Sequence, residues 1–460
     1  MKNGEFQKRP VRHTPPGAKT LFLLLAAGLG ASTAWGADLL TVYRDAVGYD
    51  AQFAAARASV EAGREKLPQG RAGLLPTVGL SSNTTWNNVD YTLRGSAGLP
   101  INYNTNGWTA TLSQPLFRWQ NWLGYNQSEL QVVQAEAQFG AAKQDLIVRV
   151  AQAYFDVLLA HDALATTRAQ KAAISEQLAS AKRNFEVGTA TITDTNEAQS
   201  RFDLAVAQEI AAESDLLVKR QALRQIVGKD LESLKNLRPN VLIGRPQPDN
   251  IDSWVETAEG GNPSVLLYKA GLEIAALEAK KQRAGHYPTL DLVATRGRTS
   301  QTATLVPIPG FGALPGSDTS ATTIGVQLAI PIFSGGLIAS RDREAVSLRE
   351  KAAADLDNAR RSAALQARQS YLGVTSGLSQ VKAYEAALVS SQSSLDSNKV
   401  GYDVGVRINI DVLNAQSQLY DTRQKLAKAR LDTLAAQLKL KAAAGILSED
   451  DLAAINALLE

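Results

Sequence analysis

The residue types that most often carry chemistry are scarce in this chain. Its 460 residues include no cysteine and only three histidines, His13, His161 and His286, which lie far apart in the sequence. No glycine-rich phosphate loop opens a helix, and neither a GxSxG nor an HExxH motif occurs. Disulfides, thiolate catalysis and an anchor on an acylated cysteine are therefore excluded. We expect no enzyme activity, no metal site and no cofactor.

Two aspartates occupy equivalent positions after short Val-Gly sequences. Asp194 follows the Val-Gly pair at 187–188, and Asp411 follows the pair at 404–405 at the same distance. Aspartate soon after a turn is typical of a helix N-terminus, where its carboxylate caps backbone N–H groups. Capping is therefore one interpretation of both residues, and it is compatible with a second role.

The N-terminus has the pattern of a secretory signal peptide. Five basic residues precede an apolar run at 21–29, and small residues then lead to an expected cleavage site before Ala37. The run is shorter than the ~20 residues of a membrane-spanning helix, so we expect residues 1–36 to be a leader. This segment carries a net charge of +4, which leaves −1 on the remaining chain. No basic surface for nucleic acid is expected.

The remaining chain contains an internal duplication. Residues 185–188 recur as 402–405 at an offset of 217 positions, and residues 72–77 recur as 284–289 at an offset of 212. A repeat of this length indicates a duplicated supersecondary unit rather than a short solenoid. The expected divisions are a first repeat at 37–235, an equatorial connector at 236–262, a second repeat at 263–447 and a short C-terminal segment at 448–460.

Each repeat is expected to contain a helix, two strands around a loop, a long helix, a turn and a second helix. In the first repeat we expect a helix at 38–69, strands at 76–86 and 108–116, and a loop at 87–106. In the second repeat we expect a strand from Leu290, a loop at 299–320 and a return strand at 324–332. The alternation of apolar and polar residues is typical of transmembrane barrel strands. For a single hairpin, a soluble surface hairpin would be the alternative.

The long helices favour the membrane interpretation. The run from Asn121 to Phe185 has no proline, and apolar residues recur along it every three or four positions, as in helices that pack side by side. Its counterpart runs from Gly336 to Tyr402. At 1.5 Å per residue either helix would be about 100 Å long. Many seam residues are alanine, which suits a hollow wall better than the alternative, a solid coiled-coil rod.

The number of strands predicts assembly. Two strands per repeat give four per chain, which is too few to close a barrel, and open strand edges cannot face lipid. Two copies would supply eight strands and three copies would supply twelve. The strand count alone does not choose between them.

Together these segments resemble the TolC-like outer-membrane efflux protein family over essentially the whole mature chain. The similarity is carried by the strand starts at 75–77 and 287–292, the strand-to-helix passages at 114–117 and 330–336, and the helix and turn motifs at 151–155, 183–188, 391–396, 402–416 and 442–445. The resemblance implies a homotrimer in which a 12-stranded outer-membrane β-barrel, with four strands from each chain, is continued by a long periplasmic α-helical barrel.

The function implied by this resemblance is that of an exit duct, or channel-tunnel. It would serve a tripartite efflux or type I secretion system that exports small toxic molecules or proteins, without catalysis. The implied partners are a periplasmic adaptor (membrane fusion) protein, an inner-membrane ABC or proton-driven transporter, and outer-membrane lipid. The alternative is a periplasmic coiled-coil adaptor or scaffold protein, which would lack the four alternating strands.

The resemblance also implies a closed periplasmic entrance. Links from a tyrosine and an arginine near the second Val-Gly turn to residues near the first would hold it shut; here the residues are Tyr402, Arg407, Asp194, Thr193 and Gln177. The pore constriction would be lined by two acidic positions one helical turn apart. Asp411 matches the first. The second is Asn414, a departure that predicts weaker cation selectivity.

Overall fold

The computed structural model describes residues 36–92, 99–231, 233–239, 241–305 and 313–460. All of the expected leader except Gly36 therefore lies outside the described residues. No helix within the described ranges is long and apolar enough to cross a membrane. The structure below is that of the unit formed by residues 36–460.

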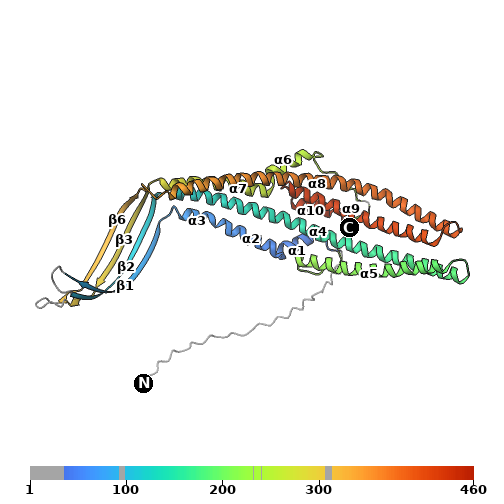
Figure 1. The fold of residues 1–460 in the computed structure, drawn as a ribbon, viewed down its shortest axis with the longest axis horizontal. Coiled ribbons are helices and arrows are strands. Elements are labelled where there is room, and N and C mark those ends of the chain that lie inside the picture. Colours follow the sequence, from blue (N-terminus) through green and yellow to red (C-terminus); the bar gives the residue numbers. More distant parts are fainter. Residues whose placement is uncertain (1–35, 93–98, 232, 240, 306–312) are drawn as a thin grey trace, which may run out of the picture. The chain divides into compact units, whose positions relative to one another are not determined.

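The order of helices and strands follows the duplication (Figure 1). The first repeat contains α1 (Leu39–Tyr49), α2 (Ala51–Arg64), α3 (Lys66–Ala72), β1 (Thr77–Tyr91), β2 (Leu99–Phe117), α4 (Trp119–Glu186) and α5 (Ile192–Val227). The second contains α6 (Ile251–Gly261), α7 (Pro263–Arg283), the 3-10 turn η1 (Ala284–His286), β3 (Thr289–Gln301), β4 (Thr304–Leu305), β5 (Ala313–Leu314), β6 (Ser317–Ala329), α8 (Leu337–Asp403) and α9 (Asn409–Ala443). The last helix is α10 (Glu449–Asn456).

The two long helices are confirmed, but the expected opening helix at 38–69 is wrong as a single element. It is broken at Asp50, whose ψ of 118° leaves the helical region, and again near Glu65. The Asp50 carboxylate accepts a hydrogen bond from the Phe53 backbone N–H at 2.7 Å, so it caps α2. It also pairs with Arg149 of α4 at 3.0 Å. Asp50, at the break, thus also has a partner about a hundred residues away in the sequence.

Both expected loops are too long. The strands β1 and β2 extend well into the range 87–106, and β3 and β6 shorten the loop expected at 299–320. Polar side chains on neighbouring strands form hydrogen bonds with each other, so the strands continue through this polar region. For example, the Asn87 amide of β1 donates to the Thr105 hydroxyl of β2 at 3.1 Å. An Asn- and Thr-rich composition can therefore continue a strand as well as end it.

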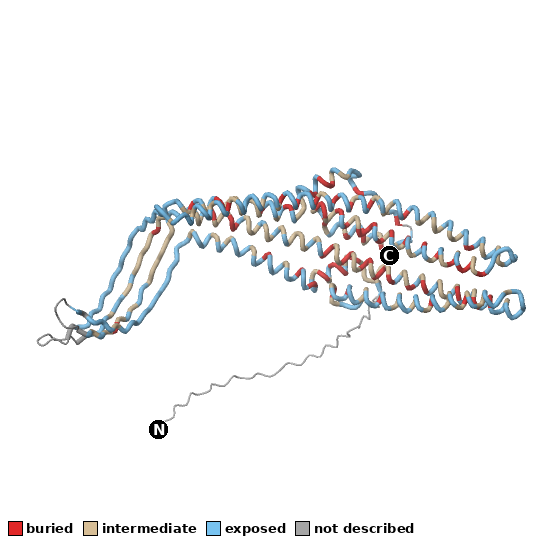
Figure 2. Tube along the Cα trace, in the orientation of Figure 1, coloured by how far each residue is buried: buried red, intermediate tan, exposed pale blue. Residues whose placement is uncertain are grey.

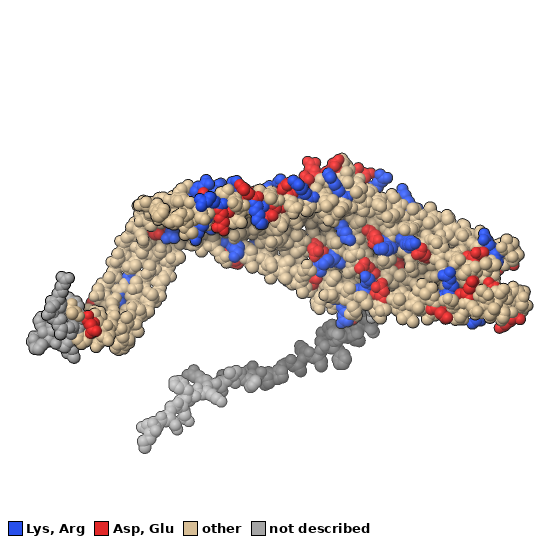
Figure 3. Space-filling model, in the orientation of Figure 1, with Lys and Arg blue, Asp and Glu red and all other residues tan. Residues whose placement is uncertain are grey.

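The four long strands form one antiparallel sheet in the order β1-β2-β3-β6. The register places Val78 opposite Leu112, Leu112 opposite Ala294, and Ala294 opposite Ile324. Because residues that pair across antiparallel strands point to the same side, these apolar side chains share one face. The view in Figure 3 shows few charged groups on the sheet and many on the helices.

The helices pack side by side in the order α5-α4-α9-α8, so that α4 and α9 lie in the middle and α5 and α8 at opposite edges (Figure 1). Burial is concentrated midway along them (Figure 2). There α1 and α10 pack on α4, α5 and α9, and the fully buried Tyr154 donates a hydrogen bond to the Lys235 carbonyl at 2.8 Å. The fold class expected from the sequence, long helices joined to four strands in two related halves, is confirmed.

Candidate gate at the paired helix turns

Two equivalent turns end the long helices. The turn between α4 and α5 contains Gly188 at φ +78°, and the turn between α8 and α9 contains Gly405 at φ +79°. Glycine is favoured in this left-handed conformation, which closes a helix by wrapping the chain back onto its last carbonyls. Accordingly, Thr189 N–H donates to the Asn184 carbonyl at 2.8 Å. Both turns lie at the same end of the helices, away from the sheet (Figure 1).

Asp194 takes part in helix capping. Its carboxylate accepts hydrogen bonds from the Thr191 backbone N–H at 2.9 Å and from the Thr191 hydroxyl at 2.8 Å, while Asp194 N–H donates to that hydroxyl oxygen at 3.2 Å. This is a capping box in which Thr191 is the N-cap and Asp194 the third helical residue. The capping interpretation therefore applies to Asp194, although the N-cap position itself belongs to Thr191.

A buried amide joins the two hairpins. Asn409, the first residue of α9, is 1% exposed. Its side-chain oxygen accepts a hydrogen bond from the Gln177 amide of α4, and its side-chain nitrogen donates to the Asp194 backbone carbonyl at 3.3 Å. One side chain thus links α9 to both helices of the first hairpin. Because it is buried, loss of these bonds would leave polar groups unpaired, at a cost of about 1–3 kcal/mol.

A second link comes from Tyr402, near the end of α8. The Asn184 side-chain amide of α4 donates a hydrogen bond to the Tyr402 hydroxyl at 3.1 Å. The Tyr402 ring packs beside Leu395, Val412 and Leu419. The hydroxyl therefore reaches the first hairpin while the ring stays in its own hairpin's core.

Arg407 is oriented toward its own hairpin. Its guanidinium lies 3.6 Å from the carboxylate of Asp411, four residues further along the chain. Within the described residues no hydrogen bond or ion pair joins Arg407 to Thr193 or Asp194, and Thr193 is exposed on α5. The structure of one chain therefore brings Gln177 and Tyr402 to the opposite hairpin, but not Arg407.

The two expected constriction residues lie one turn apart on α9. Asp411 is partly exposed, with 33% of its side chain accessible, and Asn414 is exposed. The Asn414 side-chain oxygen accepts a hydrogen bond from the Arg201 guanidinium of α5 at 2.9 Å. Each constriction residue therefore has an arginine as its neighbour.

Comparison with known proteins identifies the family to which this architecture belongs. Residues 42–229 and 254–446 match the family described as outer membrane efflux protein. The chain belongs to this family. It is 33% identical to outer membrane protein TolC of Vibrio cholerae, over 95% of this chain and 97% of that one. It is also 33% identical to the alkaline protease secretion protein AprF of Pseudomonas aeruginosa, over 92% and 88% of the two chains.

Solved structures of outer-membrane channels share the fold. The CmeC outer membrane channel of Campylobacter jejuni superposes with a TM-score of 0.76 at 17% identity, covering 91% of this chain and 89% of that one. VceC of Vibrio cholerae gives a TM-score of 0.73 at 17% identity, with 89% and 99% covered. This outer membrane efflux protein is therefore an outer-membrane exit duct that extends into the periplasm, not an enzyme. The alternative of a coiled-coil adaptor is wrong.

Three contact residues at the turns were missed from the sequence: Asn409, Asn184 and Arg201. A signal for the first was present in the duplication. The position in the first repeat that corresponds to Asn409 holds Ile192, so an apolar residue in one half matches a buried amide in the other. Ile192 is 53% exposed, so the two equivalent positions differ in burial as well as polarity, and the buried contact is made by one half only.

Proposed function

We propose that three copies of this outer membrane efflux protein form the exit duct of a tripartite efflux or type I secretion system. In this assembly the sheets of three chains close a twelve-stranded barrel, and the α4–α5 and α8–α9 hairpins form a periplasmic tunnel that is gated at their turns. The division into repeats at 37–235 and 263–447, with a connector at 236–262, is part of the same proposal. The observation that carries it is that each chain has two unpartnered edges in its sheet and two in its layer of helices.

The edges of the sheet support closure between copies. Within the described strands β1 and β6 each pair on one side only, so the sheet ends in two open edges. Their apolar side chains are exposed, with Val78 74% and Ile324 74% accessible. Backbone groups cannot remain unpaired in lipid. Pairing β1 of one copy with β6 of the next removes both edges and turns the shared apolar face outward.

The outer helices carry a matching pair of faces. Exposed, uncharged residues recur along α5 in steps of three, four or seven: Thr193, Ser200, Leu204, Ala207, Ala211, Ser214, Val218, Gln221 and Gln225. We call this set the α5 seam. The corresponding α8 seam consists of Ser362, Leu365, Gln369, Leu372, Ser376, Ser379, Ala383, Ala386, Ser390, Ser393, Ser397 and Val400, all exposed. Such spacing is typical of helices that pack along their length.

The two seams lie at opposite edges of one chain, which favours a head-to-tail ring. A contact between different surfaces of identical subunits generates a closed ring when the rotation closes. The many small side chains in the two seams permit close approach of the helices. They supply too little side-chain volume to fill a core, as expected for a hollow wall. The choice of three copies rests on the family resemblance.

The turns would then gate the periplasmic entrance. The Asn409 bridge and the Tyr402–Asn184 bond tie the two hairpins of each chain together at the end of the tunnel. Threefold repetition would multiply these modest bonds, and three Asp411 carboxylates would surround the opening, with Asn414 one turn away. Thr193 and Arg407 belong to the proposed gate through contacts between copies or after a rearrangement of the turn.

The transport system is supported by the names of the relatives. Two of them are named for secretion: AprF for alkaline protease secretion and PrtF of Dickeya chrysanthemi for secretion of proteases. We infer that a periplasmic adaptor docks on the helical tunnel and that an inner-membrane transporter, either ABC or proton-driven, supplies energy and selects the cargo.

The assembly can be tested by extracting the protein in detergent and measuring its native mass. A trimer that forms conducting channels in planar bilayers is the expected result. A stable monomer in aqueous buffer would contradict the proposed channel.

A further inference from the structure

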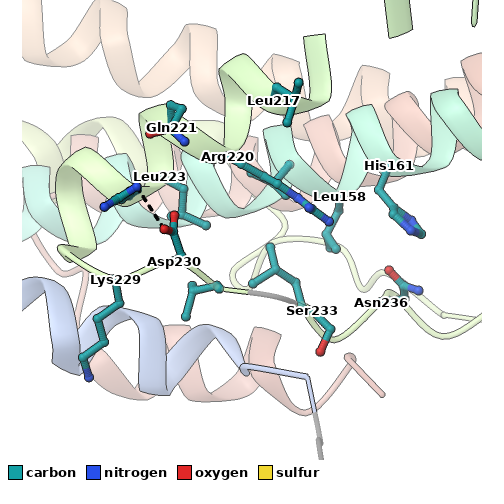
Figure 4. Close-up of a pocket in the computed structure, with 14 residues that line it drawn as sticks. Leu158, His161, Leu217, Arg220, Gln221, Leu223, Lys229, Asp230, Ser233 and Asn236 are labelled. Atoms are coloured by element: carbon teal, nitrogen blue, oxygen red, sulfur yellow. Dashed lines mark ion pairs between the residues drawn. The ribbon is translucent and has the colours of Figure 1, made fainter. Parts of the chain in front are cut away.

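A cavity of about 470 Å³ opens at the α5 edge of the chain, halfway along the helices (Figure 4). It is bounded by α4, α5 and the segment that follows α5. Its wall is rich in leucine: Leu158, Leu217, Leu223, Leu231 and Leu234. Leu217 is 61% exposed, so a large apolar side chain remains accessible to solvent at this site.

The charges around the cavity are largely satisfied within the chain. Arg224 lies 2.9 Å from the carboxylate of Asp230, the pair joined by the dashed line in Figure 4. Lys229 lies 2.7 Å from the carboxylate of Asp45. Arg220 also lines the cavity and forms no ion pair with the described residues, so one guanidinium lies beside the leucines. Apolar groups still make up most of the wall, and an apolar side chain fits them.

The duplication shows what covers the equivalent surface in the other half. Arg220, Leu223 and Arg224 correspond to Gln437, Leu440 and Lys441. In the second repeat these residues line a small depression bordered by the connector. The Gln437 amide donates to the Gly244 carbonyl at 2.7 Å. An extended segment thus lies on this helix surface in the second repeat, while the first repeat leaves it open.

The same connector presents a large apolar side chain to solvent. Leu242 is 93% exposed, whereas its neighbour Val241 is 9% exposed and Ile243 packs against the core. The backbone on either side is fixed by bonds from α9: Arg430 donates to the Pro239 carbonyl at 2.8 Å, and Gln437 donates to that of Gly244. Leu242 therefore points outward between two neighbours that pack inward.

The cavity and the segment that carries Leu242 lie at the same level along the helices. The cavity is on the α5 edge, whereas this segment crosses α9 and continues to α6, which packs on α8 at the other edge (Figure 1). Leu242 lies between the points fixed by Arg430 and Gln437, which correspond to residues 213 and 220 of α5, within about a turn of the cavity. A rotation axis parallel to the helices preserves this level. Gln221 also belongs to both the cavity wall and the α5 seam.

We propose that Leu242 of the partner subunit fills this cavity, so that the connectors form a belt of three identical contacts around the middle of the duct. The inference rests on the trimer proposed above and adds a specific contact to it. It explains why one chain has both an exposed leucine and a leucine-lined cavity, because each is covered only in the ring.

Disulfide crosslinking tests the contact, since the chain has no native cysteine. The informative variant combines Leu242→Cys with Leu217→Cys. Disulfides require Cα atoms roughly 4.4–6.8 Å apart, so we expect covalent dimers and trimers on non-reducing gels after mild oxidation. The matched control combines Leu242→Cys with Ile210→Cys. Ile210 is 62% exposed on the same helix but lies seven residues, about 10 Å, from Leu217. It should give little crosslinking.

Native mass measured on the same samples separates the two proposals. A trimer without crosslinks in the Leu242–Leu217 variant, or with equal crosslinking in the Ile210 control, would overturn the inference and leave the trimer intact. Absence of a trimer in the unmodified protein would overturn the assembly itself. Labelling of Leu217→Cys by a bulky maleimide gives an independent readout. Protection in the trimer, lost with Leu242→Ala, supports the contact. Labelling in the intact trimer, or protection that survives Leu242→Ala, contradicts it.

Discussion

The guanidinium of Arg407 lies 3.6 Å from the carboxylate of Asp411, so each proposed acidic group at the constriction has a positive charge beside it on its own chain. In a trimer three such pairs would face the opening. The carboxylates would attract cations and repel anions, but the neighbouring arginines would offset part of that field. The selectivity of the entrance should therefore depend on both residues.

Substitutions at this pair are expected to shift ion selectivity in opposite directions. Asp411→Ala should lower the preference for cations, whereas Arg407→Gln should raise it because the carboxylate loses its neighbour. The measurement is the reversal potential across a planar bilayer with a salt gradient. Equal reversal potentials for the two variants would show that the pair does not line the narrowest part of the pore.

The effect of substituting Asn414 on ion selectivity should depend on Arg201. Asn414→Asp should add three carboxylates to the ring and strengthen cation selectivity. Because Arg201 donates to Asn414 at 2.9 Å, a carboxylate at this position would be paired with that arginine. The increase should thus be modest in the single variant and larger in combination with Arg201→Gln. If the double variant matches the single one, Arg201 does not face this position in the assembly.

Stability at low pH should depend on Asp50. Its hydrogen-bonded pairing with Arg149 lowers the pKa of the Asp50 carboxyl. A lowered pKa contributes stability above the unfolded value of about 3.9, and this contribution is lost as pH falls through the lower folded value. The midpoint of thermal unfolding in detergent should therefore be insensitive to this group near neutral pH and decline below about pH 4.

The same pair predicts a large effect of substitution. Arg149→Met leaves a buried carboxylate unpaired, which costs on the order of 3–5 kcal/mol. Arg64→Met is a suitable control. It removes exposed pairs with Glu61 and Glu136, each worth about 0–1 kcal/mol. Asp50→Asn keeps an oxygen that can cap α2 and should recover part of the loss in the Arg149→Met background. Similar midpoints for the two methionine variants would contradict this assignment.

Surface tags should distinguish the strand ends from the helix turns. Tags placed between Tyr91 and Leu99, or between Gln301 and Ser317, should label intact cells, while tags at Gly188 or Gly405 should label only permeabilised cells. A tag at Thr105, within the loop expected from the sequence, should block assembly because this residue pairs with both Thr85 and Gln301. Labelling of intact cells through a tag at Gly405 would reverse the orientation.

The strongly periodic elements were predictable from sequence. The helix expected from Asn121 to Phe185 is α4, Trp119–Glu186, because uninterrupted apolar spacing over many turns has few alternatives. The strand ends were not, since Asn and Thr satisfy each other across a ladder as readily as they form a loop. Nor was the break at Asp50, or the pairing of Asp50 with Arg149 from a distant helix.

The candidate site was likewise predictable only in part. Tyr402, Gln177 and Asp194 could be located through the family resemblance, and the structure brings each of them to the contact between the hairpins. The identity of their partners depended on tertiary packing. Asn409 is polar where its counterpart is Ile192, and this asymmetry between repeats is the feature of the sequence that could have indicated it.

The links between the hairpins predict how the entrance can be opened. Tyr402→Phe removes one hydroxyl bond, and Asn409→Ile replaces the buried amide with the residue found at the equivalent position. Each bond contributes about 0.5–1.5 kcal/mol, and threefold repetition could bring the combined change to a few kcal/mol, enough to populate an open state. The double variant should raise single-channel conductance several-fold. Its conductance should exceed that of the double variant Tyr402→Phe, Arg407→Ser, because Arg407 is bonded within its own hairpin. Tyr371→Phe, which removes a hydroxyl bond to Asp249 far from the turns, should conduct like the unmodified channel. Intact trimers of the double variant with unchanged conductance would show that these bonds do not hold the entrance shut.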